Sequence, residues 1–264
     1  MRLKCVGLIV LISIFSFVQP LSGFAEQKEN KEQSEIPSHV LNIAKDNTYP
    51  NSTEDQEVLE AEKLTDELIN NSDVRISNPE LIEMLNETTI RPSPFAVGYR
   101  GEIFLGRWPL SYESKERNTN WEYQEINVNE LNNQGGQKNE EMSYEQKEEK
   151  HIKGGLTTKA THSDQMMKLI LLEAQNNTKL PLSFQSVIGR GTKQNNKYAV
   201  PVNKVGKLHA YAPALNEKGE VAFGDVYIQL KGSKMSIDVK NVTRQGIGAW
   251  IPIQDHVSFS FELQ

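Results

Sequence analysis

The feature that most constrains the fold is a two-residue alternation of apolar and polar side chains near the C-terminus. It occurs in two runs, Met235–Val239 and Val257–Leu263. Successive side chains of a β-strand point to opposite faces of the sheet, so each run predicts a strand with one buried and one solvated face. Half-buried strands of this kind are typical of antiparallel sheets. His256 and Ser258, at the polar positions of the second run, are therefore expected on the solvated face.

The alternation changes phase between residues 221 and 230. Val221 and Phe223 occupy odd positions, whereas Val226 and the apolar residues after it occupy even ones. Gly224 lies where the phase changes, which predicts a β-bulge at this residue. Just upstream, residues 216–219 (Asn-Glu-Lys-Gly) have asparagine first and glycine fourth, the pattern of a type I turn.

Helical spacing appears in three places. The first helix is expected to begin at a capping box at Thr53 and to stop at Asn70-Asn71. The second is expected to begin with Asn78 as N-cap and Pro79 in the first turn, where its missing N–H costs nothing. The third covers about Ser163–Asn176, capped by Ser163 or Asp164, and is apolar on most of its circumference, so it should lie inside a core.

Between the second and third helices, the sequence predicts β-strands and then a linker. Alternation at Phe95, Val97 and Tyr99 indicates one strand, and residues 102–110 and 121–131 indicate two more. Residues 132–155 are charged, nearly devoid of aliphatics and bounded by Gly-Gly pairs, which predicts a linker or insertion.

The expected fold class is α+β, mainly antiparallel β-sheet with a few packed helices, one of them lying across a sheet. The expected organisation is a signal peptide (1–25), a flexible polar stalk (26–50), an N-terminal α+β half (51–131), the charged linker (132–155) and a β-rich C-terminal half (156–264). The two halves form either one domain or two. Within the stalk, the apolar residues between Ile36 and Ile43 are expected to dock as a short turn.

The N-terminus carries the pattern of a secretory signal. Arg2 and Lys4 precede a 13-residue uncharged apolar run, Val6–Val18, and small residues stand before a cut at Glu26. An uncleaved membrane anchor is the alternative, because about 20 apolar residues span a bilayer. A lipoprotein is disfavoured because Cys5, the only cysteine, precedes the apolar run. We therefore expect a secreted or extracytoplasmic envelope protein that touches the membrane at most through a retained N-terminal segment.

Composition excludes several classes of function. Loss of the leader leaves 27 basic side chains against 35 acidic ones, a net charge near −8. This balance argues against nucleic acid and against electrostatic adhesion to anionic lipids or wall polymers. The processed chain has no cysteine, so disulfides, zinc-thiolate sites, iron–sulfur clusters and cysteine nucleophiles are excluded.

No reactive motif stands out, so no catalytic, cofactor-binding or metal-ligating residue is assigned. Serine-hydrolase and zinc-peptidase spacings are missing, and two Gly-x-Gly pairs, at 189–191 and 246–248, lack the further glycine of a dinucleotide loop. Two carboxylates would suffice for a glycoside hydrolase, which 35 acidic residues neither support nor exclude. Isolated histidines and tryptophans have structural roles more often than catalytic ones. They are His39, His151, His162, His209, His256, Trp108, Trp121 and Trp250.

The layout resembles the YfkD-like family of Bacillus-type bacteria. The resemblance covers the signal peptide, the polar stalk, the Pro-Phe-x-x-Gly-x-Arg-Gly stretch at 94–101 and the Gly-x-Gly-Ala-Trp of the β-rich tail, 246–250. It implies export and a shared fold, and it lends no catalytic residues because the family is uncharacterised.

The leading functional hypothesis is a non-enzymatic binding protein at the cell envelope, with an unidentified envelope partner or ligand. It depends on the export signal together with the lack of a recognisable reactive constellation. A carboxylate-dependent hydrolase of envelope polymers and a structural component of an envelope or spore layer are the alternatives. A His209- or His256-carboxylate pair in a cleft would favour the enzyme, whereas an exposed apolar patch would favour binding or assembly.

Overall fold

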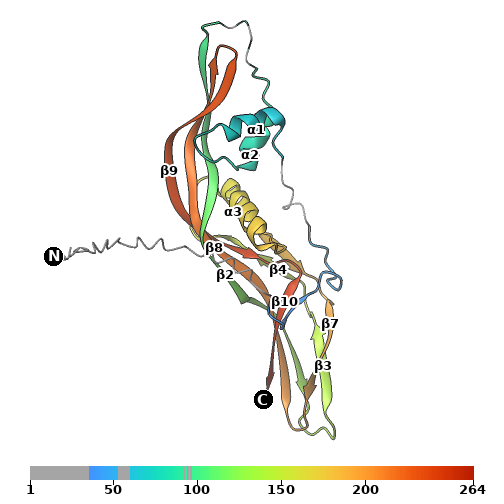
Figure 1. The fold of residues 1–264 in the computed structure, drawn as a ribbon. Coiled ribbons are helices and arrows are strands. Elements are labelled where there is room, and N and C mark those ends of the chain that lie inside the picture. Colours follow the sequence, from blue (N-terminus) through green and yellow to red (C-terminus); the bar gives the residue numbers. More distant parts are fainter. Residues whose placement is uncertain (1–35, 53–59, 92, 94, 96) are drawn as a thin grey trace, which may run out of the picture. The chain divides into compact units, whose positions relative to one another are not determined.

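One long strand, β8, organises the sheet, because it is hydrogen-bonded along both of its edges (Figure 1). The computed structural model describes residues 36–52, 60–91, 93, 95 and 97–264, and Ser34–Gln264 form one compact unit. In chain order its elements are β1 (Val40–Asn42), α1 (Lys63–Asn70), α2 (Pro79–Asn86), β2 (Arg100–Asn132), β3 (Glu140–Glu145), β4 (Lys150–Lys153), β5 (Gly155–Leu156), α3 (Ser163–Thr178), β6 (Gln185–Ile188), β7 (Lys193–Val200), β8 (Val205–Lys231), β9 (Lys234–Pro252) and β10 (His256–Leu263).

The strand order of the main sheet is β1-β10-β8-β9-β5, with β2 on the other edge of β8. β2 follows β8 along its whole length, from the pair Arg100–Lys231 to the pair Asn132–Val205. The opposite edge of β8 is shared, because its first residues pair with β10 and the rest pair with β9. Two further two-stranded sheets, β3-β7 and β4-β6, complete the described part of the chain. Every named ladder is antiparallel, as expected, and three helices pack on these strands.

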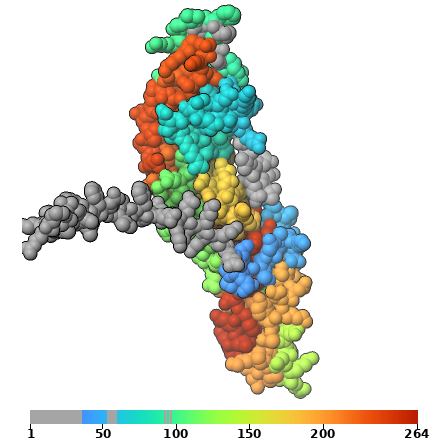
Figure 2. All heavy atoms as spheres, in the orientation of Figure 1, coloured from blue at the N-terminus to red at the C-terminus, as the bar shows by residue number. Residues whose placement is uncertain are grey.

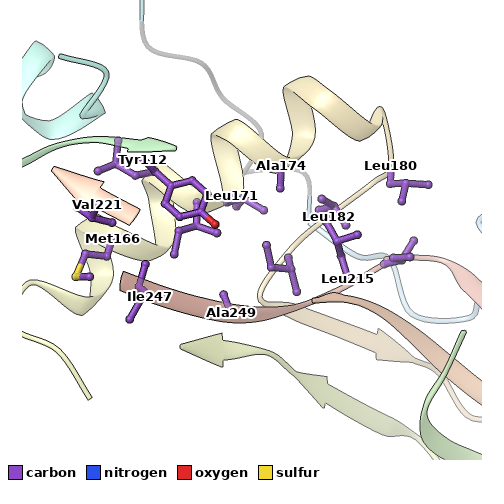
Figure 3. Close-up of a cluster of buried hydrophobic side chains, with 14 of the residues drawn as sticks. Tyr112, Met166, Leu171, Ala174, Leu180, Leu182, Leu215, Val221, Ile247 and Ala249 are labelled. Atoms are coloured by element: carbon purple, nitrogen blue, oxygen red, sulfur yellow. The ribbon is translucent and has the colours of Figure 1, made fainter. Parts of the chain in front are cut away.

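Helix α3 lies across one face of the main sheet and forms the largest buried cluster with it (Figure 3). It buries Met166, Leu169, Ile170, Leu171 and Ala174, so the prediction of a helix inside a core is confirmed. Its start differs from the prediction. The N-cap position is His162, in a left-handed conformation (φ 58°), and neither expected side chain caps the helix there.

Helices α1 and α2 cover a second stretch of the sheet, nearer the β8–β9 turn. The predicted cap of α2 is confirmed, since Asn78 Oδ1 accepts hydrogen bonds from the N–H groups of Glu80 and Leu81 at 2.9 and 3.3 Å. The Asn78 amide also donates to the carbonyl oxygen of Pro109 at 2.7 Å, which ties the helix to β2. α1 ends at Asn70 as expected, whereas the predicted capping box at Thr53 lies outside the described residues.

The β8–β9 register shifts at the predicted position, between Phe223 and Asp225, but the extra residue of the bulge lies in β9, between Lys240 and Thr243, opposite Gly224. The predicted turn at residues 216–219 is wrong, since these residues lie inside β8 and pair with β2 and β9 at once. Long-range pairing on both edges overrides the local turn preference. Gly219 has a packing reason instead, because an added Cβ would lie 2.6 Å from the Tyr112 hydroxyl and 2.1 Å from the Glu113 carbonyl oxygen.

Residues 132–155, expected to be a charged linker, contain strands β3, β4 and β5. The apolar alternation that would have revealed β3 is only two residues long, Met142 and Tyr144, and both side chains are buried. The expectation of a solvated His256 and Ser258 is also wrong, since both are at most 5% exposed. β10 lies between β1 and β8, so neighbouring strands flank these side chains on both sides.

The N-terminal part of the described chain is held on the sheet. Val40, Leu41 and Asn42 pair with β10, so the apolar stretch that was expected to dock as a turn docks as strand β1. The Asn47 and Asn51 side chains then donate to Asp255 at 2.9 and 2.7 Å. The expected signal peptide, residues 1–25, and the first part of the expected stalk lie outside the described residues.

Candidate functional site

Exposed apolar side chains concentrate where β2 begins. Nine large apolar side chains are exposed in the described chain, and five of them fall within ten residues: Phe95, Val97, Tyr99, Ile103 and Phe104. Phe95 and Val97 are 90% and 94% exposed. Single exposed apolar residues need no explanation, but a cluster of them marks a candidate interaction site.

Three cations share this end of the sheet. Arg100 starts β2, Lys231 ends β8 and Lys234 starts β9, and the ladders place Arg100 opposite Lys231 and Lys231 opposite Lys234. Residues directly opposite in a ladder point to the same face, so the three positive groups stand in a row. None of them forms an ion pair with a carboxylate of the described residues. Like charges in opposite positions repel, so this row costs stability.

An aromatic pair continues the same face away from the strand ends. The rings of Phe104 and Tyr227 lie 5.0 Å apart, and the ammonium group of Lys240 lies 4.4 Å from the centre of the Tyr227 ring. Lys240 also donates to Glu102, and this hydrogen bond is the main reason that the pKa of the Glu102 carboxyl is lowered. Glu102 is thus already neutralised by Lys240, which leaves the charge of Arg100 and its two neighbours uncompensated.

A hollow of about 280 Å³ opens between the strand ends. It is lined by three residues of β2 and three of β8: Arg100, Gly101, Glu102, Gln229, Leu230 and Lys231. We call the exposed apolar residues, the three cations and this hollow the strand-end surface, which is defined by Phe95, Val97, Tyr99, Arg100, Ile103, Phe104, Lys231 and Lys234. Figure 2 shows this end of the strands, with the atoms of residues near 100 beside those of the β8–β9 hairpin.

This surface was not predicted from the sequence. The alternation of Phe95, Val97 and Tyr99 predicted a strand, whereas β2 begins only at Arg100 and these side chains are exposed. The preceding residues already argued against a strand here, because Pro92 and Pro94 cannot donate hydrogen bonds to a ladder. The row of cations could not be seen, because it depends on the register of strands more than 100 residues apart.

One of the predicted candidate histidines meets a carboxylate. His209 Nδ1 lies 2.9 Å from Glu125 Oε2, and its ring stacks on Tyr211 at 6.3 Å. Burial raises the pKa of the Tyr211 hydroxyl, with further contributions from the Glu125, Glu122 and Glu262 carboxylates. An imidazole, a phenol and several carboxylates therefore gather on one surface, with Glu125 half exposed.

The remaining histidines do not join this group. His151 pairs with the exposed Glu149 at 2.9 Å, and His256 is buried with Nδ1 2.8 Å from the Gln254 carbonyl oxygen. His162 occupies the N-cap position of α3, and the backbone carbonyl of His39 accepts from the N–H of Phe259.

A second charged group lies under α3, and its carboxylate is closed to solvent. Glu217 is fully buried, and Arg117 binds both of its carboxylate oxygens at 2.7 and 3.2 Å. The Tyr112 hydroxyl lies 3.5 Å from the same carboxylate, and burial is the main cause of its raised pKa. A bidentate arginine that occupies a carboxylate leaves it little capacity for acid–base chemistry, so we assign this group a structural role.

The tryptophans do not form a shared platform. Trp108 packs on the cluster beneath α1 and α2, Trp121 packs on the α3 cluster, and Trp250 stacks on Tyr123 at 5.1 Å. Gly248 of the Gly-x-Gly-Ala-Trp stretch lies close to Thr157, so close packing of a neighbouring segment explains it. The strands thus distribute these residues among separate clusters.

Within the described ranges, no three histidine, cysteine, aspartate or glutamate side chains converge as metal ligands would. Among the helices of the described chain, none has both the length and the apolar character needed to cross a bilayer.

Comparison with known proteins identifies the family. A family model described as YfkD-like protein matches residues 37–264. The chain belongs to the YfkD-like family. It is 51% identical over 257 residues, or 97% of its length, to the uncharacterised protein YfkD of Bacillus subtilis (strain 168), and the match covers 95% of that protein. No solved structure matches.

The resemblance that the sequence motifs indicated is thereby confirmed. The matched region includes every residue of the strand-end surface and of the Glu125–His209 group. The relative is itself uncharacterised, so the family relationship adds no role for any of these residues.

Proposed function

We propose that this chain is an exported, non-enzymatic protein that binds a component of the cell envelope through its strand-end surface. The observation that carries the proposal is the combination, at one end of the sheet, of exposed apolar side chains with a row of cations that have no carboxylate partner among the described residues. Exposure of apolar groups and repulsion among the cations both oppose folding, and a bound partner would relieve both costs.

Binding can be tested in intact cells with a photo-crosslinking amino acid at Phe104. Leu263 is the matched control, because it is also an apolar, partly exposed strand residue but lies at the end of β10. We expect position 104 to crosslink to one class of envelope component, identified by mass spectrometry, and position 263 to give little or no product. Equal labelling at both positions would contradict the proposal.

Export can be tested separately by sequencing the N-terminus of the protein recovered outside the cytoplasm. A chain that begins at Glu26 would support cleavage of the leader. A soluble, full-length chain inside the cell would contradict export, whatever position 104 binds.

A carboxylate-dependent hydrolase of envelope polymers is the second candidate, and the Glu125–His209–Tyr211 group favours it. If this group were catalytic, Glu125→Gln and His209→Gln would each lower hydrolysis of purified wall polymers by about 100-fold or more. The proposed binding function predicts no such activity in the wild-type protein and unchanged crosslinking in both variants.

A further inference from the structure

We propose that the partner of the strand-end surface is a bilayer rich in anionic phospholipid. This inference depends on the proposed binding function and names its ligand. The cations of the surface bind the phosphate groups of the lipids, and its most exposed apolar side chains enter the acyl region.

The first argument comes from charge. Arg100, Lys231 and Lys234 stand opposite one another without carboxylate partners among the described residues. An array of phosphates matches such a row, and a cation near an anionic bilayer contributes about fivefold to partitioning. The net charge of the protein predicts repulsion, but only charges within a Debye length of about 8 Å from the lipid act strongly. Local charge at the contacting end therefore outweighs the acidic remainder of the chain.

The second argument comes from the apolar groups. Phe95 and Val97 are almost fully exposed in the segment that leads into β2, next to the first cation of the row. Tyr99 is 55% exposed, and its hydroxyl lies beside Gly101, at the base of this segment. At membrane interfaces, apolar side chains enter the acyl region, and tyrosine, arginine and lysine lie behind them with their polar ends among the headgroups. The strand-end surface has the same arrangement.

The third argument comes from geometry. Ile103 and Phe104 are adjacent in β2 and therefore point to opposite faces of the sheet, yet both are exposed. An apolar patch that surrounds the end of a sheet suits a fluid layer, which can close around it, better than a single flat protein surface. The hollow lined by Arg100 and Lys231 is a shallow, open depression, so a headgroup can reach both cations from the surface.

The test measures insertion at the site itself, so that the apolar N-terminus does not interfere. In the full chain with Cys5→Ser, an environment-sensitive fluorophore is attached at Val97→Cys or, as a control, at Leu263→Cys. With phosphatidylglycerol-containing vesicles, we expect a blue shift and quenching by nitroxide-labelled acyl chains at position 97 only. Pure phosphatidylcholine vesicles should produce little change at either position.

The cation row is tested by vesicle partitioning of the full-length variants. Arg100→Gln/Lys231→Gln should weaken the response of the position-97 probe by about 25-fold in lipid concentration. Lys204→Gln/Lys207→Gln removes the same charge at the other end of β8 and should change it by less than about twofold. Phe95→Ser should weaken it by about tenfold.

Three results would overturn the lipid assignment: equal signals at positions 97 and 263, equal effects of the two charge variants, or tight binding of soluble poly(glycerol phosphate) with no blue shift at position 97. The last result would identify an anionic polymer as the ligand. It would leave the proposed binding function intact, because crosslinking at Phe104 in cells would still be specific. Loss of that specific crosslinking would instead refute the binding function itself.

Discussion

Strands β2, β8 and β9 have opposite characters in two regions. Under α3 they bury Tyr112, Val221 and Ile247 (Figure 3). The carboxylate of Glu217 is also fully buried there. At the ends near the β8–β9 turn, the same strands expose apolar side chains and a row of cations. α3 covers the first region. Near the turn, α1 and α2 pack on the face that carries Ile228 and Ile237, and the opposite face, with Arg100, Phe104 and Lys231, is left exposed.

The ion pairs of the two regions make the same contrast. Arg117–Glu217 links β2 to β8 and has a fully buried carboxylate. Lys240–Glu102 links β9 to β2, and both of its side chains are 43% exposed. Water solvates each charge of the exposed pair if the other is removed. Within the part of the chain that the structure describes, the side-chain groups bound to the Glu217 carboxylate are those of Arg117 and Tyr112, so the loss of Arg117 should be far more costly.

The largest effect is expected from Arg117→Met, which keeps most of the aliphatic stem but leaves Glu217 buried without a counterion. We expect a loss of about 3–5 kcal/mol in the free energy of unfolding, measured by urea denaturation. Glu217→Gln should cost less, about 1–3 kcal/mol, because the Arg117 side chain is 26% exposed and can turn to water.

The double variant Arg117→Met/Glu217→Gln completes this cycle. It should be more stable than Arg117→Met alone, because no charge then remains buried. If Glu217→Gln lowered the free energy of unfolding as much as Arg117→Met, the explanation by a buried carboxylate and a partly solvated arginine would be wrong.

A smaller effect is expected from glycine substitutions on the two faces of the sheet. Gly219→Ala places a methyl group 2.1 Å from the Glu113 carbonyl oxygen, so backbone must move, and we expect a loss of about 1–3 kcal/mol. Gly246 lies on the neighbouring strand, opposite Glu220, and an added Cβ would meet nothing within 4 Å. Gly246→Ala should therefore leave the melting temperature unchanged or raise it slightly. Comparable losses in both variants would refute this explanation of Gly219.

The smallest effect is expected from Lys240→Gln, whose partner is solvated. At neutral pH the unfolding midpoint should change little, and less still at high salt. The hydrogen bond from Lys240 lowers the pKa of folded Glu102, so the pair stabilises the fold above the unfolded pKa of about 4.3. That contribution is lost as the pH falls through the folded pKa.

The difference between wild type and Lys240→Gln should therefore shrink when unfolding is followed from pH 7 down to about pH 3. A difference that grew in acid would show that Lys240 acts through some other group.

Local signals predicted part of the fold well. Asn78 and Pro79 marked the start of α2, because a cap needs only neighbouring residues. The change of phase at Gly224 marked the position of a bulge, although its extra residue lies in β9, and the apolar circumference of α3 indicated a core helix. Predictions failed where a distant segment decided the outcome. Residues 216–219 have the residue types of a turn, but they lie in β8, which pairs with a strand on each side. β3 has only two apolar residues, too few to indicate a strand without its partner β7.

The candidate site was harder to predict than the fold. His209 was considered from the sequence, but its partner Glu125 became visible only through the β2–β8 register. Phe95, Val97 and Tyr99 were visible as apolar residues, and their pattern indicated a strand, which does not tell whether their side chains are covered. Exposure is a property of what covers a residue, which no short window of sequence contains.

By itself, the sequence determined the fold class, the family, the antiparallel character of the strands and the thiol-free, acidic composition of residues 26–264, because these follow from composition and short-range pattern. Only the tertiary structure decided that Arg100, Lys231 and Lys234 form a row, that Glu217 is buried beneath α3, and that one end of the sheet stays uncovered. The physical reason is that strand register and helix cover bring together residues from separate elements, such as Arg100 and Lys231 or Glu217 and α3, and local preference does not encode such pairings.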